Sequence, residues 1–393
     1  MSISAETADF TDAAASAVRS GGRSLPAAAV AAAAGATSIV VGLLWDISWH
    51  RSIGRDTFWT PAHMAIYFGG LLAAAGVAPL ILRSTAHDGP ERASSVRVGP
   101  FRGPLGGWVM LWGAAAMLAS APFDDWWHNA YGLDVRVISP PHAVLAAGMF
   151  AVVGGAMLLT LSVQNGARAL DLRASGALYA WASGVLVTLA ATFIIEYTFP
   201  LHQHGWLFYA ITGAVFPLFL VAGARASKLT FAAARAAAIS MAIVAVMDWA
   251  LPLFPAQPRL GPIYNPITRM VPFCFPLLIV FPALAMDLIL SRWQPRSDTL
   301  LAAALGIAFL GVFLLVQWPF ASFQMMPASR NWFFLGDRYW SYWFHPDYPW
   351  RYGFQGGPGD ALNGRGLAIA ALLSIVSARA GLAAGSWMRR VRR

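Results

Sequence analysis

Long apolar segments recur along this chain, and they constrain its fold more than any other feature of the sequence. A helix needs about 20 mostly apolar residues to cross the hydrocarbon core of a bilayer. About ten segments meet that requirement, at residues 26–48, 61–83, 103–122, 140–163, 175–198, 205–223, 231–253, 270–290, 299–318 and 364–386. We therefore expect an all-α integral membrane protein, a polytopic bundle of about ten transmembrane helices surrounded by membrane lipid.

The charge composition fits a membrane protein better than a nucleic-acid-binding protein. Charged residues make up 11% of the chain, whereas a soluble domain carries about 25%. The net charge of +9 arises from basic residues in short loops between the apolar segments, which is typical of a topology signal. We therefore expect no nucleic-acid partner. Because Cys274 is the single cysteine, the chain alone supplies neither a disulfide framework nor a thiolate cluster.

The distribution of lysine and arginine predicts the orientation of the chain. The terminal segments and even-numbered loops hold 18 of these residues, and the odd-numbered loops hold 9. The positive-inside rule then places both termini in the cytoplasm, with residues 1–25 as an N-terminal tail. We expect a multi-pass protein of the bacterial cytoplasmic (inner) membrane. Seven of the eight histidines fall at its outer, periplasmic face: His50, His63, His128, His142, His202, His204 and His345.

One sequence pattern occurs twice at that outer face. The segments WDISWHRSIGRDTFWTPAH (45–63) and FDDWWHNAYGLDVRVISPPH (123–142) both contain Asp-x3-His-x3-Gly-x-Asp, followed by Pro-x-His. Each copy joins an odd-numbered span to the next span, so the repeated unit is a helical hairpin. The matched pairs are Asp46 with Asp124, His50 with His128, Gly54 with Gly132, Asp56 with Asp134, Pro61 with Pro140, and His63 with His142.

The spacing in the first copy predicts a metal site between two helix ends. Asp46 and His50 are four residues apart, so they share one face of the last turn of a helix. Pro61 suits the first turn of the next helix, and His63 then faces back toward that pair. One carboxylate and two imidazoles with open positions are a ligand set that copper, iron and zinc sites use.

The second copy repeats this arrangement with Asp124, His128 and His142. The alternative for each copy is a surface ion pair or a helix cap. Ionisable residues at membrane depth are costly, and the duplication favours the metal hypothesis. Asp56 and Asp134 are interpreted either as loop residues, with Asp56 paired to Arg55, or as acceptors for the N–H of a ligand imidazole.

The first copy resembles the copper-site motif in a membrane-embedded subunit of the copper membrane monooxygenases, which include the particulate methane, ammonia and short-alkane monooxygenases. The residues that carry the resemblance are Asp46, His50, His63, Arg55-Asp56-Thr57 and Thr60-Pro61-Ala62-His63. The second copy resembles the neighbouring site of that family, with Asp124 where the family has an amide residue. The resemblance covers about residues 26–165, and residues 166–318 are additional transmembrane helices.

The resemblance implies copper as the metal, with zinc and iron as alternatives. It implies a monooxygenase subunit that oxidises a small apolar substrate with dioxygen, as a homotrimer or in a heteromeric complex with other monooxygenase-like subunits. A copper-handling membrane protein without oxygenase activity is the alternative function.

Two further regions carry candidate ligands. Glu196, His202 and His204 lie in EYTFPLHQHGW, where the alternative is an interfacial loop with solvated histidines. Residues 319–363 form a long aromatic segment that we expect to cap the outer face, with His345, Met325 and Met326 as further ligands. The alternative there is an interfacial aromatic anchor. Residues 364–393 form the last transmembrane helix and a basic cytoplasmic tail.

Overall fold

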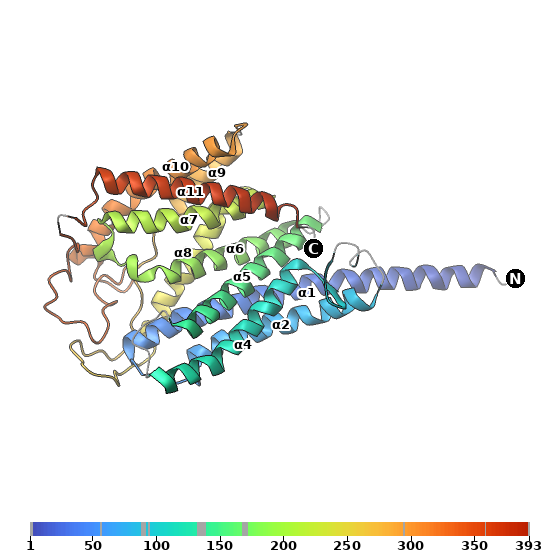
Figure 1. The fold of residues 1–393 in the computed structure, drawn as a ribbon, viewed down its shortest axis with the longest axis horizontal. Coiled ribbons are helices and arrows are strands. Elements are labelled where there is room, and N and C mark those ends of the chain that lie inside the picture. The colour runs from blue at the N-terminus through green and yellow to red at the C-terminus, as the bar shows by residue number, and fades with distance from the viewer. Residues whose placement is uncertain are drawn as a thin grey trace. The chain divides into compact units, whose positions relative to one another are not determined.

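The fold is mainly helical (Figure 1). The computed structural model describes residues 3–55, 57–87, 92, 95–131, 139–166, 172–293, 295–357 and 359–391, with the side chains of these residues apart from 3–26, 128, 166 and 172. The helices are α1 (Ile3–Ser52), α2 (Pro61–Ala86), α4 (Leu105–Tyr131), α5 (Pro140–Gly166), α6 (Leu172–Phe193), α7 (Trp206–Ala226), α8 (Ala232–Ala250), α9 (Val280–Arg292), α10 (Asp298–Met325) and α11 (Gly364–Met388). Strands β1 (Val96–Val98) and β2 (Phe101–Gly103) form an antiparallel hairpin.

Nine helices in the described part of the chain are long and apolar enough to cross a membrane. They correspond to all of the expected spans except the eighth, which confirms a polytopic all-α membrane protein. Many of their large apolar side chains point outward, such as Leu315, Trp112 and Leu372. An exposed apolar face is what a helix surrounded by lipid requires.

The eighth expected span, 270–290, is not one continuous helix. Residues 270–279 have irregular backbone, and α9 covers only Val280–Arg292. Pro272 and Pro276 lie in this stretch, and proline has no backbone N–H to continue a helix.

Side chains from distant helices bind the backbone of this irregular stretch. Asp248 of α8 accepts a hydrogen bond from the Phe273 N–H at 2.7 Å. Gln317 of α10 accepts one from the Leu278 N–H at 2.9 Å. Irregular backbone at membrane depth needs such partners inside the protein, because lipid offers none.

The expected N-terminal tail is helical from residue 3 onward and continuous with the first span in α1. Alanine is frequent in this stretch, and alanine has the highest intrinsic helix propensity.

The chain forms two compact units. Unit 1 comprises residues 1–36, 69–179 and 392–393, and unit 2 comprises residues 37–68 and 180–391. In unit 1, α4 and α5 pack closely along their length. At one point of close approach, Gly113 of α4 faces the backbone of Gly148 of α5. A Cβ atom on Gly113 would lie 2.8 Å from the Gly148 carbonyl oxygen. Unit 2 contains the last part of α1 (from residue 37) and the first part of α2 (to residue 68), together with α7 to α11.

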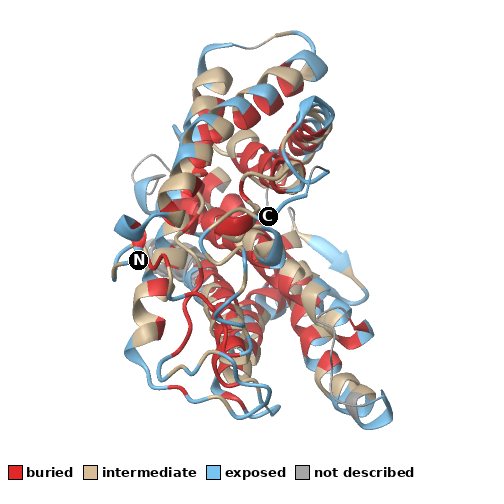
Figure 2. Ribbon diagram, turned by 90° about the vertical axis from the view of Figure 1, so that its left-hand side faces the viewer, coloured by how far each residue is buried: buried red, intermediate tan, exposed pale blue. Residues whose placement is uncertain are grey.

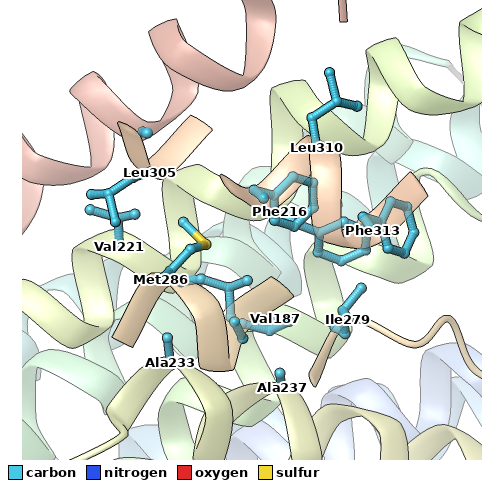
Figure 3. Packing of buried hydrophobic residues seen from close by; sticks show 14 of the residues in the cluster. Val187, Phe216, Val221, Ala233, Ala237, Ile279, Met286, Leu305, Leu310 and Phe313 are labelled. Atoms are coloured by element: carbon cyan, nitrogen blue, oxygen red, sulfur yellow. The ribbon is translucent and has the colours of Figure 1, made fainter. Parts of the chain in front are cut away.

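The core of unit 2 is a cluster of buried aromatic and aliphatic side chains (Figure 3). The rings of Phe216 and Phe313 each contact the ring of Phe309 there, with centroids 6.4 Å and 5.5 Å apart, and Met286 of α9 packs in the same cluster (Figure 3). Figure 2 shows the same burial pattern on the ribbon, with buried residues along one side of most helices and exposed residues on the other. This core packs side chains of α6 to α11 against one another.

Candidate metal centre

The first copy of the repeated pattern lies at the junction of α1 and α2, in unit 2. Asp46 and His50 are in the last two turns of α1, and His63 is the third residue of α2. Pro61 occupies the first helical position of α2, as the sequence predicts. The helix start is reinforced by Thr60, whose Oγ1 atom accepts a hydrogen bond from the Thr57 N–H at 3.0 Å.

Gly54 allows the chain to leave α1 and turn toward α2. Its φ angle of +83° lies in the left-handed region that glycine favours. The Trp49 carbonyl accepts hydrogen bonds from the N–H groups of both Ile53 and Gly54, which closes the last turn of α1. A Cβ atom at position 54 would lie 2.1 Å from the Tyr342 hydroxyl, so space as well as backbone angle requires glycine here.

The three side chains of this copy converge on one point. Nε2 of His63 lies 3.1 Å from Oδ1 of Asp46, and Nε2 of His50 lies 3.9 Å from Oδ2. One ligand atom from each residue lies within 4.8 Å of the other two. Atoms that each bind one ion at about 2.0–2.2 Å are about 3–4 Å apart, so small movements would complete a three-ligand site. Among the described residues this is the single such group of three.

A hydrogen bond to the backbone determines which ring nitrogen of His63 carries a proton and which one faces Asp46. Nδ1 of His63 lies 3.0 Å from the Thr57 carbonyl oxygen, which can only accept, so Nδ1 carries the proton. In the neutral ring, Nε2 then presents its lone pair to the Asp46 carboxylate. Oδ1 of Asp46 is buried and accepts no hydrogen bond from any described residue. Either a second proton on the ring or a metal ion between these atoms, which are 3.1 Å apart, would satisfy both groups, so the donor set is compatible with a metal ion.

Exposure differs among the three side chains. Asp46 is 16% exposed and His63 is 23% exposed, whereas His50 is 45% exposed. The carboxylate is thus the most enclosed of the three candidate ligands, and the His50 side of the group is the most open to solvent. Three protein ligands leave at least one position for an exogenous molecule on an ion of four or more ligands.

A buried arginine anchors the end of α1 beside the site. The guanidinium of Arg51 donates hydrogen bonds to Ser341 Oγ at 3.2 Å, to the Pro272 carbonyl at 3.3 Å and to the Tyr339 carbonyl. Ser48 adds a hydrogen bond to the Val271 carbonyl at 2.6 Å. Segments 270–273 and 339–342 therefore hold the helix turn that carries Asp46 and His50.

Sequence reasoning did not identify this role for Arg51, because it counted the residue as a loop charge. No local pattern distinguishes a buried arginine at a helix end from an exposed one. Its partners Pro272, Tyr339 and Ser341 are more than 200 residues away in the chain.

The second copy repeats one contact of the first within unit 1. His142 is the third residue of α5, and its Nε2 atom lies 3.5 Å from Oδ1 of Asp124 on α4. Asp124 and His142 are 32% and 35% exposed, more than their counterparts in the first copy. The side chain of His128 and the residues Asp56 and Asp134 lie outside the described part of the structure.

The structure does not bring Glu196, His202 and His204 into a metal-ligand group among the described residues. Glu196 is exposed in a short 3₁₀ turn, Ile195–Tyr197. The His204 ring is stacked between Trp318 and Phe354, with ring centroids 3.8 Å and 3.5 Å away. Its Nε2 atom lies 3.1 Å from the Trp318 carbonyl oxygen, and burial lowers its pKa. His204 is thus a packing residue.

The long aromatic segment also supplies no further ligand to the group of Asp46, His50 and His63 among the residues with a described position. Its first part is the end of α10, which continues to Met325. The His345 ring packs at a tilt of 48° against Tyr264, with centroids 5.2 Å apart, and its Nδ1 atom lies 3.7 Å from Oδ2 of Asp347. Met325 packs against a small aromatic cluster, and Met326 is exposed. The segment does contact the end of α1, because the Tyr342 N–H donates to the Arg51 carbonyl.

An apolar cavity of about 60 Å³ lies within unit 2. Leu44, two residues before Asp46 on α1, contributes to its wall. Other lining residues are mostly aliphatic or aromatic, among them Phe216, Val244, Phe273 and Phe275. The space is smaller than the roughly 150 Å³ of an engineered cavity that holds benzene, so it suits a molecule of few heavy atoms.

No family model, curated protein or solved structure matches this chain. The geometry of the site and the resemblance of its motif are therefore the grounds for a functional proposal.

Proposed function

We propose that this protein is a copper-binding integral membrane protein in which Asp46, His50 and His63 hold the metal. The observation that carries the proposal is the 3.1 Å approach of Asp46 Oδ1 to His63 Nε2, with the His63 proton held on the opposite nitrogen by Thr57. One carboxylate and two imidazoles suit copper, and zinc and iron are the alternatives for the same donors. Asp124, His128 and His142 would form a second site of the same kind.

We further propose that the protein acts as a monooxygenase-like subunit on a small apolar substrate. Copper, when bound, would supply the activation of dioxygen. One oxygen atom would enter a C–H bond and the other would leave as water, with two electrons and two protons from a donor. The chain itself contributes the ligands, the Arg51 anchor that orients them, and apolar walls that exclude water.

The cavity beside Leu44 supports the choice of substrate class. Its lining is apolar and its volume of about 60 Å³ fits a short hydrocarbon better than an aromatic or a sugar. Such a substrate partitions into the bilayer and would reach the bundle from its lipid-facing side. The electron donor is expected from a partner subunit, in a heteromeric complex or a homotrimer.

We propose the bacterial inner membrane as the location, with both termini cytoplasmic and the site at the periplasmic face. The chain can still cross the membrane ten times, although α9 alone is too short for one crossing. Irregular residues 270–279 at about 3 Å each, followed by α9 at about 1.5 Å per residue, exceed the hydrocarbon thickness of about 30 Å. The excess of basic residues in the terminal and even-numbered segments supports this orientation.

Elemental analysis of the purified full-length protein tests the metal assignment. Wild type should be compared with His50→Ala/His63→Ala and with His128→Ala/His142→Ala, each of which should lose about one copper equivalent. His87→Ala/His345→Ala removes the same number of imidazoles away from both sites and serves as the matched control. Unchanged copper in both site variants would refute the ligand assignment.

Oxygen consumption separates the proposed activity from the alternative of copper handling without turnover. Copper-loaded membranes should consume dioxygen when given a reductant and a short alkane, and the His50→Ala/His63→Ala variant should not. Stoichiometric copper without alkane-dependent oxygen uptake would favour the copper-handling alternative.

A further inference from the structure

The β-hairpin between α2 and α4 places two arginines directly opposite each other. Arg97 of β1 pairs with Arg102 of β2 at the centre of the three-residue ladder. Residues opposite each other on an antiparallel pair project to the same face, with Cβ atoms about 4.5–5.5 Å apart. Two like charges in that position destabilise a hairpin unless an anion binds between them.

The hairpin nevertheless has a fixed position against the adjoining helices. The Arg102 N–H donates to Thr85 Oγ1 at 2.8 Å, and Thr85 is in the last turn of α2. The Trp108 indole of α4 donates to the Val96 carbonyl at 3.1 Å. A Cβ atom at Gly103 would lie 2.6 Å from Ile81, which shows how closely β2 packs on α2. The two guanidiniums are thus presented on a rigid support.

Neither arginine is neutralised within the described part of the chain. No described carboxylate lies within ion-pair distance of Arg97 or Arg102. The side chain of Arg97 donates a hydrogen bond from Nε to the Gly99 carbonyl at 3.0 Å, within its own turn. Arg83, exposed in the last turn of α2, adds another positive charge to this end of unit 1.

The opposite face of the hairpin is apolar. Alternation along a strand directs Val96, Val98 and Phe101 away from the arginines. Val96 is 38% exposed and Phe101 is 44% exposed. The hairpin lies in the connection between two membrane-spanning helices and bonds to Thr85 in the last turn of the first, so we place it at the membrane surface. Apolar side chains there favour contact with acyl chains.

We infer that Arg97 and Arg102 bind the phosphate of an anionic phospholipid headgroup. Arginine pairs with phosphate through two parallel N–H···O bonds, and two opposed arginines can clasp one phosphate from both sides. The exposed Phe101 and Val96 on the opposite face favour a position of the hairpin at the lipid surface, where the phosphate within reach of the arginines is that of a headgroup. This site is separate from the proposed copper site and does not depend on it.

Lipid binding by the full-length protein in detergent tests the inference. Dioctanoyl phosphatidylglycerol should be titrated into wild type and into Arg97→Gln/Arg102→Gln, with bound lipid counted by native mass spectrometry. Each arginine that contacts the phosphate is worth about fivefold in affinity, so the double variant should bind about thirtyfold more weakly. Arg389→Gln/Arg390→Gln changes the net charge equally at two exposed residues elsewhere and should bind nearly as wild type.

Three results would overturn the inference. These are unchanged binding by Arg97→Gln/Arg102→Gln, an equal loss in the Arg389→Gln/Arg390→Gln control, and competition by inorganic phosphate at a concentration equal to that of the lipid. If the hairpin variant does not fold, Arg97→Lys/Arg102→Lys keeps the charge and loses the paired geometry. That variant should bind several-fold more weakly than wild type, and wild-type affinity would contradict a paired phosphate site.

Discussion

Oδ1 of Asp46 lies 3.1 Å from Nε2 of His63, and this contact joins the last turns of α1 to the first turn of α2. The two residues are separated by a loop that turns at Gly54 and ends at Pro61. The Thr57 carbonyl holds the proton of His63 on Nδ1, so the nitrogen nearest Asp46 carries a lone pair. A cation between the two groups, either a metal ion or a second proton on the ring, would remove the repulsion that the neutral ring has with the carboxylate.

Asp46→Asn should weaken copper binding while leaving the fold intact. The amide has the same shape as the carboxylate but lacks the charge that balances the metal ion. We expect a loss of about 10–100-fold in copper affinity, measured by competition with a chelator of known affinity. Asp347→Asn, at an exposed acid beside His345, is the matched control. An Asp46→Asn protein that binds copper as wild type does would contradict ligation by this carboxylate.

Gly54→Ala should destabilise the junction of α1 and α2. The φ angle of +83° is strained for alanine, and the added Cβ atom would lie 2.1 Å from the Tyr342 hydroxyl. Gly99→Ala is the control, because Gly99 has a φ angle of +58° but no neighbouring atom within 4 Å. Backbone strain alone costs about 1–3 kcal/mol, so Gly99→Ala should lower the melting temperature less than Gly54→Ala does. Equal falls in melting temperature in the two variants would show that the contact with Tyr342 adds nothing to the backbone strain at position 54.

Arg51→Met should lower both stability and copper affinity. The substitution removes the donors to Ser341, Pro272 and Tyr339 and leaves buried acceptors without partners. Each such loss costs about 1–3 kcal/mol. Arg269→Met is the control, because exposed Arg269 also donates to a backbone carbonyl, that of Leu253. Thermal melting and chelator competition measure the two effects, and copper affinity unchanged in Arg51→Met would show that this anchor does not position the ligands.

Acid should destabilise the protein partly through His204 and His202. Burial lowers the pKa of both residues below the usual value of 6.5. Below about that pH the unfolded chain binds more protons than the folded one, so the free energy of unfolding falls as pH falls. Melting temperatures between about pH 7.5 and pH 5.5 measure this slope.

His204→Phe keeps a ring between Trp318 and Phe354 but cannot titrate. Its melting temperature should therefore fall less steeply with acid than that of wild type. His345→Gln, at a 57% exposed side chain, is the control for the removal of one imidazole elsewhere in the chain. An unchanged slope in His204→Phe would mean that another group causes the acid sensitivity.

The sequence by itself determined the features that depend on local spacing. Apolar length located nine helices of the described chain, and the prolines at 61 and 140 marked the starts of α2 and α5. The spacing of Asp46 and His50 along one helix, with His63 just inside the next, was enough to predict that these three side chains lie near one another. These features follow from helix periodicity and from proline chemistry, which act within a few residues. Metal ligation itself stays a prediction.

Only the tertiary structure decided the features that depend on distant partners. The irregular backbone of the eighth span, which contains Pro272 and Pro276, is satisfied inside the protein because Asp248 and Gln317 accept the N–H groups of Phe273 and Leu278. His204 packs between two aromatic rings instead of joining a metal group, and Arg51 is buried because segments far along the chain supply its acceptors. A hydrogen bond or a ring stack across such separations leaves no periodic signal in the sequence, since each partner alone is compatible with many environments. Packing chooses among those environments when the whole chain has folded.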